Sequence, residues 1–192
     1  MATKKKITKK KAAPKKAPKK KSAKLPAVPA GFRTVTPHII VSPCLEAMEL
    51  YKKAFGAKTV RTMEGMGKVM HAEMKIGDSI VMLSDEMGDM PGTPPREIPR
   101  QTPKNAHAST GGVMLYVNDV DKWHDRAVAA GCTTSMPPSD QFWGDRYAQV
   151  EDPFGHVWAI ATQIKKLTTK QMNAAMAKMS APLPSSDEAP IV

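Results

Sequence analysis

Two histidines and a glutamate in the first half of the chain have the chemistry of a general base: His38, His71 and Glu73. In the expected strand Lys68–Ile76, apolar and polar side chains alternate, and the apolar set should pack on helices. His71 and Glu73 then face a cavity or solvent, and His38 shares the cavity face of the first strand. An imidazole near a carboxylate can accept a proton close to neutral pH. We therefore take His71 and Glu73 as catalytic candidates and all three as ligand-binding candidates. The alternative is that the histidines are polar lining or surface residues with ordinary hydrogen bonds.

A second group of candidate ligand-binding residues is Trp143, Asp145 and Arg146, in a loop that enters a strand. The guanidinium of Arg146 has the planar fork that binds a carboxylate or a phosphonate-like anion. Asp145 could orient that guanidinium, and Trp143 could cover an apolar ligand. The alternative is an Arg–Asp pair that only fixes the loop against the second half of the chain.

The elements that must position these residues form a pattern that occurs twice. Each half starts with an apolar strand, Val35–Val41 or Val113–Val117, that leads into an amphipathic helix. Ser42 is the expected N-cap of the first helix, with Pro43 at the first helical position. Both helices should stop at a glycine in the left-handed conformation, which these sequences supply at Gly56 and Gly131.

Three strands should follow each helix. The expected strands are Thr59–Glu64, Lys68–Ile76 and Ser79–Asp85 in the first half, and Thr133–Met136, Arg146–Glu151 and His156–Gln163 in the second. Equivalent landmarks recur about 75 to 78 residues apart. The simplest interpretation is a pair of βαβββ units in tandem. The alternative is an α+β sheet whose halves match by chance.

Several runs of residues resemble one known family. They are Thr36–Val41, Leu50–Gly56, His71–Met74, Phe142–Tyr147 and Asp152–Trp158. Together they resemble the PhnB-like branch of the vicinal-oxygen-chelate superfamily, which also holds glyoxalase I, bleomycin-resistance proteins and extradiol dioxygenases. The resemblance spans about residues 32–179. It implies an α+β fold in which two tandem βαβββ modules form a curled mixed sheet around a cavity, with helices on the outer face, commonly as a homodimer.

The metal site of that superfamily is expected to be absent. Metal-using members place four His or Glu ligands on the first and last strands of each module. Laid on this chain, the pattern falls on Thr36, Met82, Gly112 and Ala159. These side chains are poor ligands for a divalent metal ion. We therefore predict no metal at these positions and no cofactor, and we leave open whether the protein is an enzyme. A displaced metal site at His38, His71 and Glu73 is the alternative.

The net charge of +11 belongs to one end of the chain. Residues 4–24 hold twelve lysines and no acidic residue, which leaves 17 basic side chains against 18 acidic ones elsewhere. Lys, Ala and Pro bury little surface, so we predict that residues 1–30 are disordered, as are 181–192. Such a tail could bind nucleic acid without specificity, or another anionic surface. The alternative is a dispensable, solubilising extension.

The remaining divisions follow from composition. We expect a vicinal-oxygen-chelate-like domain over residues 31–166, with modules 33–86 and 111–164 joined by a Pro-rich linker at 87–110, and a C-terminal helix over 167–180. The two cysteines, Cys44 and Cys132, cannot form a disulfide framework, so a reducing cytoplasm is the expected compartment. No apolar run is long enough to span a membrane.

These observations favour a PhnB-like protein that binds a small organic ligand, with Arg146 as the handle for an anionic group. A divalent-metal-dependent lyase or dioxygenase of the same superfamily is one alternative. A nucleic-acid-associated protein that uses its lysine-rich tail is the other.

Overall fold

The structure is a computed structural model, and it describes residues 26–88 and 96–179. The predictions for the tail at 4–24, for the end at 181–192 and for part of the Pro-rich linker lie outside these residues. The first module contains β1 (His38–Ile40), α1 (Cys44–Phe55), β2 (Lys58–Gly65), β3 (Lys68–Ile76) and β4 (Ser79–Ser84). The second contains β5 (Gly112–Tyr116), α3 (Val120–Ala130), β6 (Thr133–Asp140), β7 (Asp145–Glu151) and β8 (Val157–Gln163). A short helix, α2 (Pro103–Ala106), lies between the modules, and α4 (Thr169–Met179) follows them.

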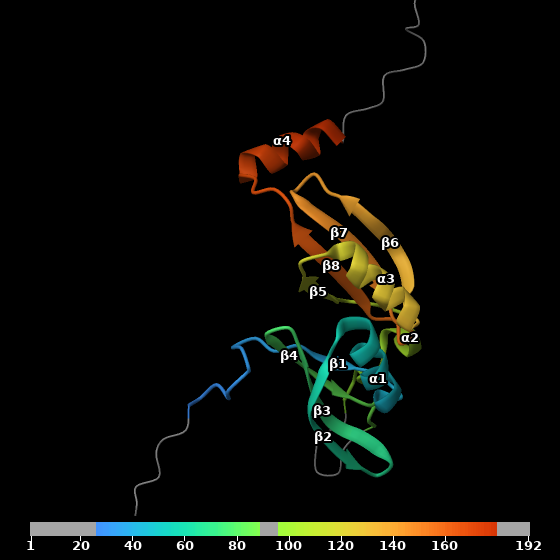
Figure 1. Cartoon of the computed structure of the whole chain (residues 1–192). Helices are drawn as coiled ribbons and strands as arrows, with labels where there is room; N and C mark the ends of the chain where they lie inside the picture. Colours follow the sequence, from blue (N-terminus) through green and yellow to red (C-terminus); the bar gives the residue numbers. More distant parts are fainter. Residues whose placement is uncertain (1–25, 89–95, 180–192) are drawn as a thin grey trace, which may run out of the picture.

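Each module forms its own four-stranded mixed sheet. The strand orders are β1-β4-β3-β2 and β5-β8-β7-β6, and in each sheet the first strand pairs in parallel with the last. The predicted α+β fold with two tandem βαβββ modules is therefore confirmed. The sheets are not closed into one, however, so the expected curled sheet around a single cavity is replaced by two separate sheets (Figure 1).

The helices lie at the junction of the modules rather than on an outer face. Figure 1 shows α1 and α3 next to each other where the two modules meet. Arg126 of α3 donates from Nε to the backbone oxygen of Ala54 at the end of α1 (2.6 Å). Phe55 of α1 stacks on Trp158 of β8 with ring centroids 4.4 Å apart. One hydrophobic core thus joins the modules, and the opposite face of each sheet is left open.

The first helix starts through a contact that is distant in sequence. Pro43 occupies the N-cap position and supplies no side-chain hydrogen bond. Asp85, just after β4, accepts hydrogen bonds at Oδ1 from the Cys44 amide (2.8 Å) and the Ser42 hydroxyl (3.1 Å). The prediction that Ser42 caps the helix is therefore wrong. The stops were predicted correctly, because Gly56 and Gly131 have φ values of 63° and 115°.

Hydrogen bonds hold part of the expected Pro-rich linker to the end of the first module. Glu86 accepts a hydrogen bond from the amide of Thr102 (2.7 Å) and others from the side-chain amide of Asn105 (2.9 and 3.0 Å). Thr102 in turn caps α2 by accepting from the amide of Asn105. The sequence pattern did not predict α2. These contacts hold Glu86, the last residue of the first module, against Thr102 and Asn105 within the expected linker.

Candidate functional site

His38, His71 and Glu73 meet on the open face of the first sheet, which we define by His38 on β1, Met82 and Ser84 on β4, His71 and Glu73 on β3, and Arg61 on β2. The strand register places His38 opposite Met82, Met82 opposite Glu73, and Glu73 opposite Arg61. The alternate residues of β3, Ala72 and Met74, are buried in the core on the helix side. The predicted alternation along β3, which puts His71 and Glu73 on the face opposite the helices, is therefore confirmed.

Glu73 orients the neighbouring imidazole. The Oε1 atom of Glu73 lies 3.2 Å from Nε2 of His71, and Nε of Arg61 lies 3.9 Å from the same oxygen. When His71 is neutral and donates from Nε2, its Nδ1 keeps a lone pair that can accept a proton. The Glu73 side chain is 6% exposed and that of His71 is 27% exposed, so the ring is the part of this pair that solvent or a ligand reaches.

Arg100 and Ser84 fix the tautomer of His38. Its Nδ1 lies 3.4 Å from NH2 of Arg100, and its Nε2 lies 3.2 Å from Oγ of Ser84. A guanidinium only donates, so Nδ1 is the acceptor and Nε2–H donates to Ser84. Burial, followed by the charges of Arg100 and His71, lowers the pKa of His38 below 6.5. The His38 and His71 rings meet edge to face, with centroids 6.2 Å apart.

Arg100 is a site residue that the sequence did not reveal. It comes from the segment interpreted as a Pro-rich linker, and nothing in its local pattern sets it apart from Arg96. The fold brings its NH2 within 3.4 Å of Nδ1 of His38, while Glu86 holds Thr102 two residues further on. The local sequence holds no signal for this contact.

A hollow of about 440 Å³ adjoins Glu73. One wall is the segment that precedes β1, including Val28, Phe32 and Thr36. The other wall is the open face, with Met82 and Arg61. The hollow thus combines apolar side chains with a buried carboxylate, which is the composition typical of a small-molecule site.

The second predicted group is divided between two faces of its sheet. Asp145 is buried, and its Oδ2 accepts hydrogen bonds from Nε1 of Trp143 (3.1 Å) and the hydroxyl of Tyr116 (3.4 Å). The charge of Asp145 raises the pKa of Tyr116. Trp143 also packs edge to face on Tyr147, with centroids 5.5 Å apart. Trp143, Tyr147 and Asp145 thus lie together on the open face of the second sheet.

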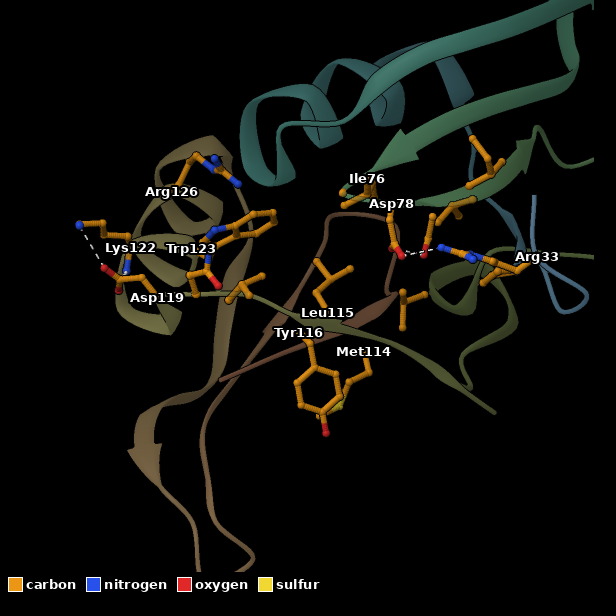
Figure 2. Close-up of a pocket in the computed structure, with 18 of the residues that line it drawn as sticks. Arg33, Ile76, Asp78, Met114, Leu115, Tyr116, Asp119, Lys122, Trp123 and Arg126 are labelled. Atoms are coloured by element: carbon orange, nitrogen blue, oxygen red, sulfur yellow. Dashed lines mark hydrogen bonds and ion pairs between the residues drawn. The ribbon is translucent and has the colours of Figure 1, made fainter. Parts of the chain in front are cut away.

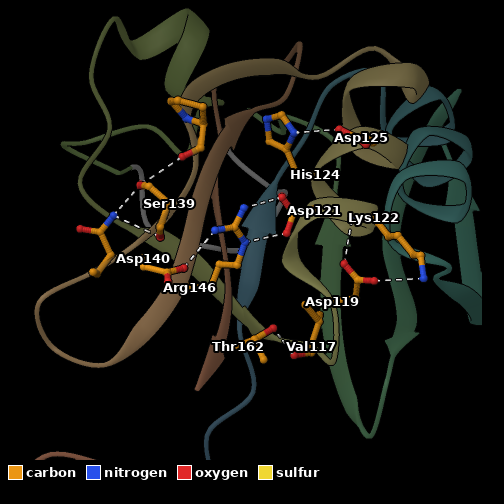
Figure 3. A network of polar contacts seen from close by, with 12 residues as sticks. Val117, Asp119, Asp121, Lys122, His124, Asp125, Ser139, Asp140, Arg146 and Thr162 are labelled. Atoms are coloured by element: carbon orange, nitrogen blue, oxygen red, sulfur yellow. Dashed lines mark hydrogen bonds and ion pairs between the residues drawn. The ribbon is translucent and has the colours of Figure 1, made fainter. Parts of the chain in front are cut away.

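Arg146 does not pair with Asp145. Its Nε and NH2 each lie 2.6 Å from a carboxylate oxygen of Asp121 at the start of α3, and its NH1 lies 3.0 Å from Asp140 on β6 (Figure 3). These hydrogen bonds raise the pKa of Arg146 and lower that of Asp121. Successive residues of a strand point to opposite faces, so Arg146 lies on the helix side. The idea that Asp145 orients Arg146 is wrong, and two carboxylates already occupy the proposed anion handle.

The positions expected for the superfamily metal are also separated. Thr36 and Met82 line the hollow beside Glu73, whereas Gly112 and Ala159 line another, of about 550 Å³, on the open face of the second sheet. Within residues 26–88 and 96–179, no three His, Cys, Asp or Glu side chains lie together as metal ligands would. The side chains present therefore do not fit the metal of the superfamily, and among the described residues His38, His71 and Glu73 do not form a three-ligand cluster either.

Another hollow, of about 830 Å³, lies between the modules (Figure 2). Its charged residues are engaged with one another or with the backbone. Arg33 pairs with Asp78 (2.8 Å), Lys122 pairs with Asp119 (3.1 Å), and Arg126 lies over the Trp123 ring at 4.2 Å. The predicted site residues do not line it.

Three other reactive side chains have structural roles. Burial and the charge of Asp85 raise the pKa of the Cys44 thiol to about 12, and burial and Asp152 raise that of Cys132 to about 12. Such thiols are poor nucleophiles. His156 is buried, and its Nε2 hydrogen-bonds the backbone oxygen of Ile40 (2.7 Å). It links β1 to the second module.

Comparison with known proteins agrees with this fold. Residues 33–160 match the family model of the Glyoxalase/Bleomycin resistance protein/Dioxygenase superfamily. Two curated relatives are the uncharacterized proteins Mb0911c of Mycobacterium bovis and Rv0887c of Mycobacterium tuberculosis. Each is 35% identical over 143 residues, which is 74% of this chain and 91% or 81% of the relative. The crystal structure of TioX from Micromonospora sp. ML1 has a TM-score of 0.54 at 24% identity, and the match covers 67% of this chain and 96% of TioX.

The chain therefore belongs to the Glyoxalase/Bleomycin resistance protein/Dioxygenase superfamily. The likeness to TioX shows the shared fold of tandem βαβββ modules. Among the described helices, none has the length and apolar character needed to cross a membrane.

Proposed function

We propose that this chain is a PhnB-like member of the superfamily that binds a small organic molecule on the open face of its first sheet, without the superfamily metal. One observation carries the proposal: His38, His71 and Glu73, which are 33 to 35 residues apart across β1 and β3, converge beside a hollow that apolar side chains also line. Polar groups gathered beside a concave site, one of them the buried carboxylate of Glu73, are the usual mark of ligand binding.

The chemistry available there is binding and proton transfer. Both ring nitrogens of His38 are engaged, by Arg100 and Ser84, so this ring positions the ligand rather than exchanging a proton. His71 is oriented by Glu73 and keeps a basic nitrogen for a proton on the ligand. An anionic group on the ligand would meet Arg100, not Arg146, since the latter is held by Asp121 and Asp140.

Histidine-selective NMR on the full chain tests this proposal directly. Addition of benzyl alcohol, benzylamine or benzoate in turn should shift the imidazole signals of His38 and His71. His124 is the internal control, because it lies on α3 and hydrogen-bonds Thr134 (2.9 Å), away from the open face. Equal shifts of all the histidine signals, or shifts of His124 alone, would contradict the location of the site.

We also propose that two copies of the chain assemble so that the open faces are covered. Met114 and Tyr116 on the open face of the second sheet are 43% and 67% exposed, and Met63 on β2 is 54% exposed. Exposed apolar residues gathered on a sheet face favour association. The homodimer that the family resemblance implies would bring a second module against each site.

A second candidate function rests on the charge of the lysine-rich tail. Twelve lysines without an acidic residue in residues 4–24 could neutralise phosphates of nucleic acid and release counterions. Binding of duplex DNA by the full chain should be salt-sensitive and independent of base sequence, because the segment holds no aromatic side chain that could stack on bases. A gel-shift comparison with a shortened chain that begins at Gly31, at two salt concentrations, tests this. Equal binding by both chains would remove the tail from the interaction.

A further inference from the structure

Glu73 has a buried oxygen without a hydrogen-bond donor. Its Oε1 faces His71 and Arg61, but its Oε2 is shielded from solvent and has no donor within hydrogen-bond distance among the described residues. Asp152, another buried carboxylate, has donors on both oxygens. A buried carboxylate oxygen without a donor is costly and uncommon in folded proteins. Glu73 also lines the hollow, so a small turn of its carboxylate would present Oε2 to a donor on a bound molecule.

The hollow also defines the rest of that molecule. Val28, Phe32 and Met82 give it an apolar lining, and its volume of about 440 Å³ exceeds that of a single substituted ring. An apolar body with one polar end would therefore place the body against these side chains and the polar end against Glu73.

The charges around the hollow favour an uncharged donor. Arg33 is paired with Asp78 at 2.8 Å, and Arg61 lies 3.9 Å from Glu73, so the charged side chains of the hollow already balance. An ammonium group would add an unbalanced positive charge beside two guanidinium groups. A carboxylate would add a negative charge beside Glu73, which is unfavourable at low solvent exposure. A hydroxyl or an amide N–H satisfies Oε2 without either cost.

We infer that the ligand of this site is a small, largely apolar molecule with a neutral hydroxyl or amide donor, which Oε2 of Glu73 accepts. The inference rests on the proposed function, since it concerns the same site. It adds the chemical class of the ligand and the single acceptor that selects it.

Four matched probes test the inference on the full chain: benzyl alcohol, benzyl methyl ether, benzylamine and benzoate. Dissociation constants come from the shifts of the His38 and His71 imidazole signals. We expect benzyl alcohol to bind about tenfold more tightly than the ether, which cannot donate, and more tightly than either charged probe. The Glu73→Leu variant should lose the preference for the alcohol over the ether. Glu64→Leu, which makes the same change at an exposed position of β2, should keep it.

The outcomes separate this inference from the proposed function. If alcohol and ether bind equally while His38 and His71 shift, the donor inference fails and the proposed site stands. The inference also fails if benzylamine or benzoate binds most tightly, or if Glu73→Leu keeps the preference. If none of the four probes shifts these histidines, both proposals fail at this site. The comparison of alcohol with ether in the unaltered chain needs no variant, so a poorly folded Glu73→Leu protein would not prevent the test.

Discussion

The buried carboxylates of Asp152 and Glu73 differ in whether both of their oxygens accept a hydrogen bond. Asp152 accepts hydrogen bonds at Oδ1 from the amides of Phe154 and His156, and at Oδ2 from the Tyr51 hydroxyl (2.6 Å) and Nε1 of Trp158 (3.0 Å). All four of these donors belong to the chain itself, and both oxygens of Asp152 are paired. Glu73 instead keeps an unpaired oxygen at a hollow. Asp152 therefore stabilises the fold, whereas the proposed ligand would use the unpaired oxygen of Glu73.

Asp152→Ala should therefore destabilise the protein strongly. The change leaves four donors without a partner in a buried region, which corresponds to a loss of about 3–5 kcal/mol in the free energy of unfolding. Urea denaturation followed by tryptophan fluorescence measures it. Asp125→Ala is the control, because the Asp125 side chain is 82% exposed and its effect should stay within about 0.5 kcal/mol. Similar losses for both variants would contradict the role given to Asp152.

The lowered pKa of His38 predicts a dependence of stability on pH. The unfolded chain binds a proton at this histidine more readily than the folded chain, so the stabilising contribution is complete above about pH 6.5 and is lost as the pH falls from there through the lower pKa of the folded state. Denaturation at pH 7.5 and 5.5 should show a smaller pH effect in His38→Gln than in the unaltered chain. NMR titration should show the His38 pKa moving upward in Arg100→Gln, since the guanidinium is one cause of the lowering. An unchanged pKa in that variant would contradict the contact.

The position of Arg146 predicts an effect on the loop and not on the ligand. Because the side chain lies on the helix side and is bound by Asp121 and Asp140, Arg146→Gln should change the dissociation constant of benzyl alcohol by less than about twofold. The imidazole shifts of His38 and His71 report that constant. A tenfold or greater rise in that dissociation constant would show that Arg146 does contribute to ligand binding.

At the scale of elements, local signals were predictable and distant contacts were not. The stops at Gly56 and Gly131 follow from single residues, and the parity of β3 follows from its alternation of apolar and polar side chains. The N-cap of α1 was missed because its acceptor, Asp85, is 41 residues from Cys44. Arg100 was missed for the same reason, since it lies 62 residues from His38 in sequence. The partners of Arg146 depend on how α3 packs on its sheet, which the strand pattern alone does not specify.

The backbone of Gly144 contacts the segment between β8 and α4, and the contact requires a glycine. Its φ of 101° is unfavourable for other residues, and a Cβ atom there would lie 2.5 Å from the backbone oxygen of Lys165. Its own carbonyl accepts hydrogen bonds from the amides of Ile164 and Lys165. Gly144→Ala should therefore lower the free energy of unfolding by about 3 kcal/mol, through both strain and a backbone clash.

Gly67→Ala is the matched control for that variant. Gly67 has a φ of 72° but nothing within 4 Å of an added Cβ, so only the strain of about 1 kcal/mol applies. Chemical denaturation of both variants compares the two costs. Equal losses would show that the contact with Lys165 adds nothing to the conformational requirement.

At the scale of the whole molecule, the open faces predict assembly. The particle should have twice the 20.9 kDa mass of one chain by sedimentation equilibrium. Met114→Glu places a charge on the open face of the second sheet and should shift the mass toward that of a single chain. Val128→Glu is the control, because Val128 on α3 is 40% exposed, close to the 43% of Met114, but lies on the helix layer. A single-chain mass for the unaltered protein would contradict the assembly.

The contacts of Tyr51 and Trp158 have a consequence for how this repeat can evolve. Tyr51 of the first module reaches Asp152 and Trp158 of the second, and all three are almost fully shielded from water. A fragment with only one module would expose an aromatic surface that its own strands cannot cover. Although the halves share one pattern of helix and strands, each covers aromatic surface of the other, so neither should fold alone. Recombination could exchange the two modules together. A single module would need new apolar packing where the other module now covers it.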